Sequence, residues 1–252
     1  MNKMYCAVSV GNVKSAPNHR SELLTQVLHG DVMTLLEKDK NWCKVLIDEE
    51  GTHGWILQSQ LELLSDLLTT NQSSKILLSK QVILANNQQP LHLVVGTFMD
   101  RLPANMLDKA CLIDLLSLEK NAQTLKDMLM VFQQVPYLWG GLTNTGIDCS
   151  GLSKLFYRFL GIRLPQLASA QATFGEFVDF LPHTKFGDLA FFENELGEIN
   201  HVGILLSSQE IYHASEVNGV VDADWIDQEG IVNKRSGKRT HKLRMIKRLV
   251  SY

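Results

Sequence analysis

The chain has 252 residues, of which 45% are hydrophobic and 20% are charged, and its formal net charge at pH 7 is -3. This composition is typical of a folded globular protein and excludes extensive disorder. The slight negative charge excludes a broad basic surface, so we expect no nucleic-acid partner.

The N-terminal sequence MNKMYCAVSVGNV lacks the apolar core of a secretory signal, and no segment is long and apolar enough for a membrane span. We therefore expect a cytoplasmic monomer without a membrane partner; a signal removed earlier would instead place it in the periplasm or outside the cell. Cysteines occur at Cys6, Cys43, Cys111 and Cys149 without a C-x-x-C pair, which favours free thiols and no cofactor or structural zinc ribbon.

Short β-compatible runs fill the first quarter of the chain. VMTLLEKD, WCKVLID and HGWILQS alternate with polar turns, which predicts a small β domain over residues 1–65 with Trp42 and Trp55 in its core. A second small β module is expected over residues 66–118, where NNQQP separates two apolar runs and predicts a hairpin turn.

The remainder, residues 119–252, changes to helix first and antiparallel strand afterwards, which predicts an α+β domain. Apolar residues at 125, 128, 129 and 132 form a helical stripe, with Thr124 as the expected cap and Pro136 as the expected end. A second helix should follow Cys149 and end at Gly161. LAFFEN, HVGILLSS and EIYHAS read as strands.

Cys149 stands out among the cysteines because it follows a turn-rich segment and directly precedes a predicted helix. The positive end of a helix and its unpaired N–H groups stabilise a thiolate, the nucleophilic form of cysteine, and can also receive an oxyanion. Position therefore favours Cys149 as a nucleophile over a small buried apolar residue, which is the expectation for the other three.

A cysteine nucleophile needs a base and a group that orients the base. His201 and His213 lie in two predicted strands, twelve residues apart and joined by the turn SSQE, so they are expected side by side on one face of a sheet. The other six histidines lie beside turns or in polar stretches; His241 is among them. A zinc site made of Cys149, His201 and His213 is the alternative, since zinc accepts Cys and His ligands.

Five motifs in this order, PYLWGG, DCSGL, GDLAFF, NHVGI and IYHAS, resemble the NlpC/p60 family of bacterial papain-like peptidases over about residues 121–225. The resemblance implies a catalytic domain of helices packed on an antiparallel sheet. It also implies that Cys149 is the nucleophile, His201 the general base and His213 the polar residue that orients it. Tyr137, Trp139, Asp148, Ser150 and Ser169 would then contact the substrate, and no metal would be involved.

HRSELLTQVLHGD and NWCKVLIDEEGTHGWI resemble a bacterial SH3-like domain. Two such modules before an NlpC/p60 domain resemble the γ-D-glutamyl-diamino-acid endopeptidases of cell-wall recycling (dipeptidyl-peptidase VI type). These cut murein tripeptides and tetrapeptides with a free N-terminal L-Ala after γ-D-Glu, and their first SH3-like domain limits substrate size. Glu22 and Asp148 would then face the substrate's ammonium group, because an ammonium requires carboxylate partners.

Two departures from the family pattern concern substrate selection. LPQLASAQ places Gln166 and Leu167 where the family has arginine and aspartate, and Thr52 stands where the SH3-like domain often has tyrosine. The alternatives to the endopeptidase are an amidase or acyltransferase on the same cysteine scaffold, and a non-catalytic peptidoglycan-binding protein.

Overall fold

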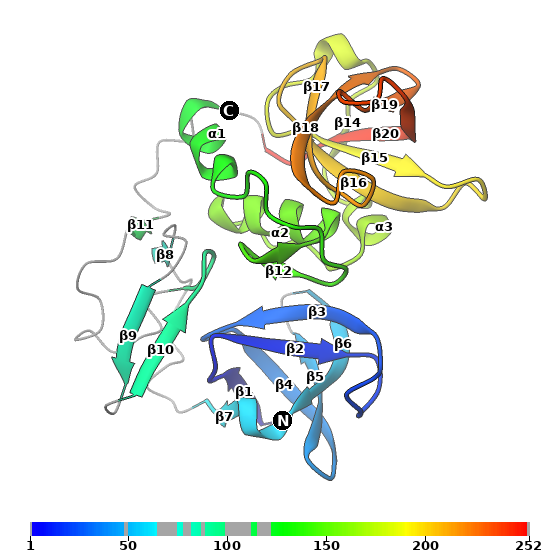
Figure 1. Ribbon diagram of the computed structural model, residues 1–252. Coiled ribbons are helices and arrows are strands. Elements are labelled where there is room, and N and C mark those ends of the chain that lie inside the picture. The colour runs from blue at the N-terminus through cyan, green and yellow to red at the C-terminus, as the bar shows by residue number, and fades with distance from the viewer. Residues whose placement is uncertain are drawn as a thin grey trace. The chain divides into compact units, whose positions relative to one another are not determined.

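Residues 2–47, 50–64, 75–77, 82–86, 89–98, 112–114 and 122–250 are described by the computed structural model (Figure 1). They form two units: Met1–Leu118 with Trp139–Asn144 and Arg158–Arg163, and Glu119–Leu138 with Thr145–Tyr157 and Leu164–Tyr252. Cys111 and the predicted domain boundaries near residues 65 and 118 lie outside the described residues.

Unit 1 begins with a seven-stranded antiparallel sheet that curls into a small barrel (Figure 1). Its strands, in the spatial order β3-β2-β6-β5-β4-β1-β7, are β1 (Lys3–Cys6), β2 (Val10–Lys14), β3 (Leu23–Leu28), β4 (Val32–Asp39), β5 (Trp42–Ile47), β6 (Thr52–Leu57) and β7 (Leu61–Leu63), with the 3-10 turn η1 (Gln58–Gln60) before β7. The predicted N-terminal β domain is thereby confirmed.

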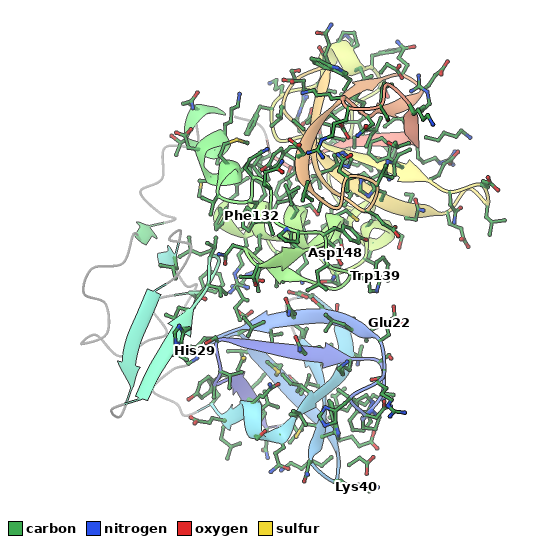
Figure 2. The ribbon with its side chains drawn as sticks, viewed as in Figure 1. Glu22, His29, Lys40, Phe132, Trp139 and Asp148 are labelled. Atoms are coloured by element: carbon green, nitrogen blue, oxygen red, sulfur yellow. The ribbon has the colours of Figure 1, made fainter. Side chains whose placement is uncertain are left out.

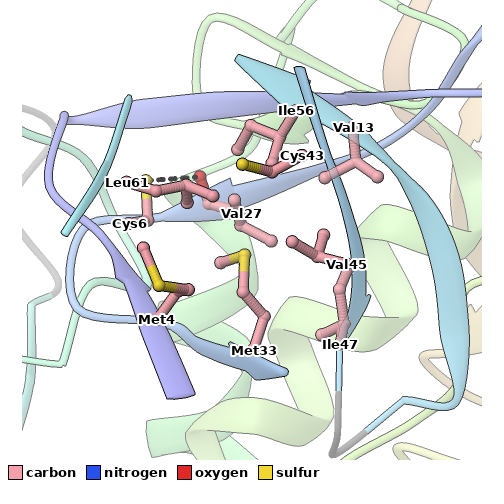
Figure 3. Packing of buried hydrophobic residues seen from close by; sticks show 10 residues of the cluster. All are labelled: Met4, Cys6, Val13, Val27, Met33, Cys43, Val45, Ile47, Ile56 and Leu61. Atoms are coloured by element: carbon pink, nitrogen blue, oxygen red, sulfur yellow. Dashed lines mark hydrogen bonds between the residues drawn. The ribbon is translucent and has the colours of Figure 1, made fainter. Parts of the chain in front are cut away.

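The barrel core follows the period of two that strands impose on their side chains. On β5, Cys43, Val45 and Ile47 alternate into a cluster of ten buried residues, shown in Figure 3. Trp42 is buried as predicted. Trp55 is only half-buried, with the Lys44 ammonium 5.9 Å from its ring, so the prediction that it belongs to the core is wrong.

The next described segments are four short strands in two antiparallel pairs. β9 (Val82–Asn86) pairs with β10 (Gln89–Leu93), and β8 (Lys75–Leu77) pairs with β11 (Leu112–Asp114). The first pair confirms the hairpin predicted at NNQQP. That these strands form a second SH3-like module remains a prediction.

Three helices follow: α1 (Ala122–Met130), α2 (Cys149–Phe159) and α3 (Ala168–Gln171). They belong to unit 2, except that the last two residues of α2, Arg158 and Phe159, belong to unit 1. The predicted stripe of α1 is buried, but the helix begins before Thr124 and ends six residues before Pro136, so both of its predicted ends are wrong. The chain turns at residues 131–134, where Gln134 has a φ of 61°. α2 ends before Gly161 as predicted, and the Gly161 N–H donates to the Arg158 carbonyl.

A second antiparallel sheet forms the rest of unit 2, in the order β14-β20-β15-β16-β17-β18-β19, and an additional pairing of β19 with β20 closes it. Its strands are β14 (Glu176–Phe177), β15 (Leu189–Glu193), β16 (Ile199–Leu205), β17 (Glu210–Ser215), β18 (Val220–Asp227), β19 (Gly230–Val232) and β20 (Arg239–Arg248), and the 3-10 turn η5 (Leu181–His183) precedes β15. Short β12 (Leu142–Thr143) and β13 (Gly146–Ile147) pair before α2.

Helix α2 is buried on its polar side as well as on its apolar side, so its polar residues need partners. The Tyr157 hydroxyl donates to the Gly187 carbonyl at 2.7 Å, just before β15. In unit 1, the Arg158 guanidinium donates to both carboxylate oxygens of Asp31, at 2.6 and 3.1 Å, and lies over the Phe98 ring. Asp31 also accepts the Leu28 N–H, so this buried ion pair fixes the end of α2 within unit 1.

Removal of the Asp31 carboxylate is expected to destabilise the protein by about 3–5 kcal/mol, because Arg158 would remain charged and buried. Urea unfolding of Asp31→Ala, followed by tryptophan fluorescence, measures this loss. Glu210→Ala, which breaks the more exposed pair with Lys234, is the control and should cost less than about 1 kcal/mol. Equal losses in the two variants would contradict the assigned role of the buried pair.

Candidate active site

Cys149 is the first residue of α2, and the residues around it secure the start of that helix. The Asp148 Oδ1 atom accepts the Gly151 N–H at 2.6 Å and the Ser150 hydroxyl at 2.9 Å. These are the contacts of a helix N-cap. Asp148 and Ser150, both predicted to contact the substrate, are therefore buried and bonded to one another beside the cysteine.

The thiol of Cys149 is protonated in the resting protein. Burial raises its pKa to about 12, the Asp148 charge adds to this effect, and backbone hydrogen bonds with Val202, Ser150 and Cys149 itself oppose it. A helix N-terminus is worth about 0.3–1 kcal/mol, less than one pKa unit, whereas full burial shifts a pKa by several units. Burial therefore opposes the thiolate that the position at a helix start favours.

His201 on β16 and His213 on β17 lie on the same face of the sheet, as predicted, with His201 Nε2 2.8 Å from His213 Nδ1. Both rings are buried. Gly203 makes this packing possible, because a Cβ there would lie 2.6 Å from Ile211 and 3.1 Å from the His213 Cβ. The glycine of the NHVGI motif therefore has a steric role next to the histidine pair.

Asp224 on β18 extends the pair into a chain that sequence reasoning did not find. Its Oδ2 atom lies 3.2 Å from His213 Nε2, and the Asn218 amide and the Lys234 N–H also donate to this carboxylate. Burial alone would raise the Asp224 pKa, but hydrogen bonds from His213, Lys234 and Asn218 hold the pKa below its usual range. The residue is therefore an ionised hydrogen-bond acceptor.

This carboxylate fixes the tautomers of both histidines. Because Asp224 only accepts, His213 carries its proton on Nε2 and presents an Nδ1 lone pair to His201. His201 then carries its proton on Nε2 and has a lone pair on Nδ1. We call Asp224, His213 and His201 the polar chain; it leaves His201 neutral with one basic nitrogen.

His241 is the second residue that sequence reasoning missed. It lies on β20, not in a loop, and its ring stacks on that of His201 with centroids 4.1 Å apart and an interplanar angle of 23°. Phe192 on β15 packs against His201 at 5.7 Å. The His201 pKa lies well below its ordinary value. Burial of the ring is the largest cause, and electrostatic interactions with His241 and His213 act in the same direction.

Tyr137 lies near Cys149, as predicted. Burial is the largest cause that raises the pKa of its phenol, and electrostatic interactions with Cys149, Asp148 and Glu216 act in the same direction. The Tyr137 backbone bonds to Gly219, and the residue forms a bridge with Ile147, two residues before the cysteine. The hydroxyl is therefore a protonated hydrogen-bond donor beside the thiol.

Two parts of the chain match known protein families. Residues 134–242 match the NlpC/P60 family, and residues 9–62 match the bacterial SH3 domain. Murein DD-endopeptidase MepS/Murein LD-carboxypeptidase of Escherichia coli is 30% identical over 139 residues, which are 54% of this chain and 71% of that protein. The chain belongs to the NlpC/P60 family.

Two further relatives span most of the chain. A protein of Bacillus cereus named Gamma-D-glutamyl-L-lysine dipeptidyl-peptidase is 25% identical over 253 residues, which are 88% of this chain and 76% of that protein. The crystal structure of an NlpC/P60 family protein from Bacillus cereus has a TM-score of 0.80 and 19% identity, and the match covers 99% of this chain and 100% of that one. The chain thus has an NlpC/P60 peptidase fold with an SH3-like barrel in its N-terminal region.

Glu22 and Trp139, two of the residues predicted to bind substrate, meet within unit 1. The Trp139 Nε1–H donates to Glu22 Oε1 at 3.0 Å, and Figure 2 shows the two side chains turned toward each other. The Trp139 side chain is 54% exposed. A second bond, from the Leu142 N–H to Gln26 Oε1, joins the same segments of unit 1.

The segment that departs from the NlpC/P60 pattern has two different environments. Gln166 is buried, accepts from the Lys154 ammonium at 2.8 Å and lies 3.5 Å from the Ser150 hydroxyl, so a buried cation stands beside it on α2. Leu167 is 61% exposed and precedes α3, and Ser169 on α3 is also exposed. The substitution at Gln166 is therefore interior, and the one at Leu167 changes the surface.

The zinc alternative finds no support in the geometry. Among the described residues, no group of three or more His, Cys, Asp and Glu side chains has the arrangement of a metal site. Both nitrogens of His213 are engaged, Nδ1 by His201 and Nε2 by Asp224, so this ring offers no nitrogen to zinc. Within the described part of the chain, no helix combines the length and apolarity needed to cross a bilayer.

Asp224→Asn is expected to slow alkylation of Cys149 by iodoacetamide at pH 7 by at least roughly tenfold, because the carboxylate that sets the histidine tautomers is lost. An amide can donate to His213 and reverse the tautomers of the polar chain. Mass spectrometry of the peptide containing Cys149 measures the rate. Asp227→Asn, the same change on β18 at a carboxylate paired with Arg239, should leave it unchanged.

In His201→Ala, the rate of Cys149 alkylation should follow the ionisation of the thiol alone, because no histidine remains to accept its proton. With a pKa of about 12, the thiolate fraction and the rate increase about tenfold per pH unit from pH 7 to 10. The wild-type protein should react faster at pH 7, because His201 accepts the proton. Identical pH profiles of the two proteins would show that His201 is not the base.

Proposed function

We propose that this protein is a cysteine peptidase that hydrolyses the bond between γ-D-glutamate and the diamino acid in murein tripeptides or tetrapeptides with a free N-terminal L-Ala. The polar chain is the observation that carries the proposal, because it creates a base with a single free lone pair on β16, the strand whose Val202 backbone bonds to the Cys149 thiol. The name of the Bacillus cereus relative supports the choice of substrate. The papain-like α+β class of the domain belongs to the same proposal.

The proposed reaction begins with two neutral groups. The Cys149 proton moves to Nδ1 of His201 as sulfur attacks the γ-carbonyl carbon, and His213 and Asp224 stabilise the imidazolium that forms. The backbone N–H of Cys149 and the Tyr137 hydroxyl donate to the oxyanion. His201 then protonates the leaving amine, and water, deprotonated by His201, hydrolyses the thioester.

A carboxylate accounts for selection of a free N-terminus in this proposal. Asp148, held at the start of α2, would pair with the substrate's ammonium group. A role for Glu22, which accepts the Trp139 Nε1–H within unit 1, stays a prediction from the sequence. A blocked terminus would leave Asp148 without a cationic partner, which disfavours binding. Ser150 and Ser169 complete the residues proposed to contact the peptide.

Cys149→Ala should lower the cleavage of L-Ala-γ-D-Glu-L-Lys and of its diaminopimelate analogue by roughly a thousandfold or more, because no nucleophile remains. Liquid chromatography with mass spectrometry measures the dipeptide released. Cys43→Ala, the same change at a buried thiol of the unit 1 core, should retain activity.

The N-acetylated peptide distinguishes the alternatives. The proposal expects slow cleavage of this peptide, whereas faster turnover than of the free peptide would favour an amidase or acyltransferase. Full activity of Cys149→Ala would overturn the assignment of the nucleophile. No cleavage of either peptide, with an unreactive Cys149, would favour a non-catalytic peptidoglycan-binding protein.

A further inference from the structure

His241 has contacts that the proposed reaction does not use. Its ring covers one face of His201 at 4.1 Å, and it lies 5.9 Å from both His213 and Phe192. Its Nδ1 atom lies 2.9 Å from the Thr240 hydroxyl, which holds the ring in this orientation. His201 is thus enclosed by three aromatic rings, of which only His213 takes part in the polar chain.

The local backbone is shaped to bring His241 to this position. On the neighbouring strand β19, a Cβ at Gly230 would lie 1.8 Å from the His241 carbonyl oxygen, and Gly230 has a φ of 139°. The registers of β20 with β15 and with β19 both shift nearby, at Phe191/Phe192 and Ile231/Val232. Side chains other than hydrogen are therefore excluded at Gly230, and the strand presents His241 to the base.

Beyond His241 lies a hollow of about 640 Å³, lined by residues 193–197, 200 and 240–242. His241 lines this hollow and also stacks on His201, so its ring separates the base from the open side of the sheet. Removal of the ring would connect the hollow to the face of His201.

We propose that His241 is a positioning residue for His201: its neutral ring excludes water from one face of the base and keeps the base ready to accept a proton in mildly acidic solution. This inference rests on the proposed function, in which His201 is the base. It adds a residue of β20 that acts through His201 and does not contact the substrate.

The electrostatics of the surroundings agree with a neutral cover. Burial, and to a smaller extent His213, lower the His241 pKa to about 4 against the opposing effect of Asp224. A neutral ring stacked on an imidazolium attracts it, whereas burial of the ring face disfavours the charged form, and burial is the largest cause of the lowered His201 pKa. The cover therefore disfavours the charged form of His201.

The titratable and charged groups around the two stacked rings come from five elements and the turn after β15. Glu193 forms ion pairs with Lys242 at 2.6 Å and with Arg244 at 3.4 Å, and Glu195 also lines the hollow, so two carboxylates stand against two cations at its edge. Among the described residues, the set is Cys149 of α2, Glu193 of β15, Glu195 in the turn after β15, His213 of β17, Asp224 of β18, and Lys242 and Arg244 of β20.

The test is the pH profile of Cys149 alkylation by iodoacetamide from pH 4.5 to 9, localised by mass spectrometry, in wild type, His241→Ala and His241→Phe. His241→Ala should move the acidic limb to higher pH by on the order of one unit, because water reaches His201 and stabilises the imidazolium. His241→Phe keeps the cover without ring nitrogens and should keep the wild-type limb. His183→Ala, an exposed histidine of η5, is the control.

An unshifted limb in His241→Ala, or equal shifts in His241→Ala and His241→Phe, would overturn the inference. Alkylation of His241→Ala at pH 8.5 at the wild-type rate confirms that the variant is folded. Because iodoacetamide needs no peptide site, the expected shift in a protein that cleaves no murein peptide would refute the proposed substrate and leave the role of His241 intact. Cleavage of murein peptides without the shift would support the proposed substrate and refute the role of His241.

Discussion

The ionised carboxylate of Asp224 determines the protonation pattern of the whole candidate site. It lies on β18, accepts the His213 Nε2–H, and is itself held by Asn218, Asn233 and the Lys234 backbone. Because Asp224 only accepts hydrogen bonds, His213 and then His201 can each adopt a single tautomer. Hydrogen bonds across three adjacent antiparallel strands thus connect the carboxylate on β18 to His201 on β16, whose other ring nitrogen keeps a free lone pair.

Burial is the second constraint, and it acts on the nucleophile and the base in opposite directions. It raises the Cys149 pKa and lowers the His201 pKa, so the two groups rest as a neutral pair. The charged pair then forms only as the proton moves from sulfur to nitrogen, with the polar chain stabilising the imidazolium. Phe192 and His241 maintain this burial, which connects the closed sheet of unit 2 to the chemistry of the site.

Local sequence patterns predicted the elements that carry the candidate residues. The position of Cys149 at the start of α2 follows from a turn-rich segment before a helical stripe, and the shared face of His201 and His213 follows from two strands joined by a short turn. Such predictions succeed because periodicity and turn chemistry act over a few residues. The ends of α1 were predicted wrongly, since tertiary packing can extend a helix beyond a local capping signal.

By itself, the sequence determined the helix and strands that carry Cys149, His201 and His213, which cysteine stands at a helix start, and the family to which the chain belongs. Only the tertiary structure placed Asp224 and His241, which are distant in sequence from Cys149, around His201. It also decided that the thiol is protonated and that Gln166 is buried beside Lys154. The reason is physical: pKa values and tautomers depend on burial and on hydrogen bonds between neighbouring strands, and neither quantity is encoded in local spacing.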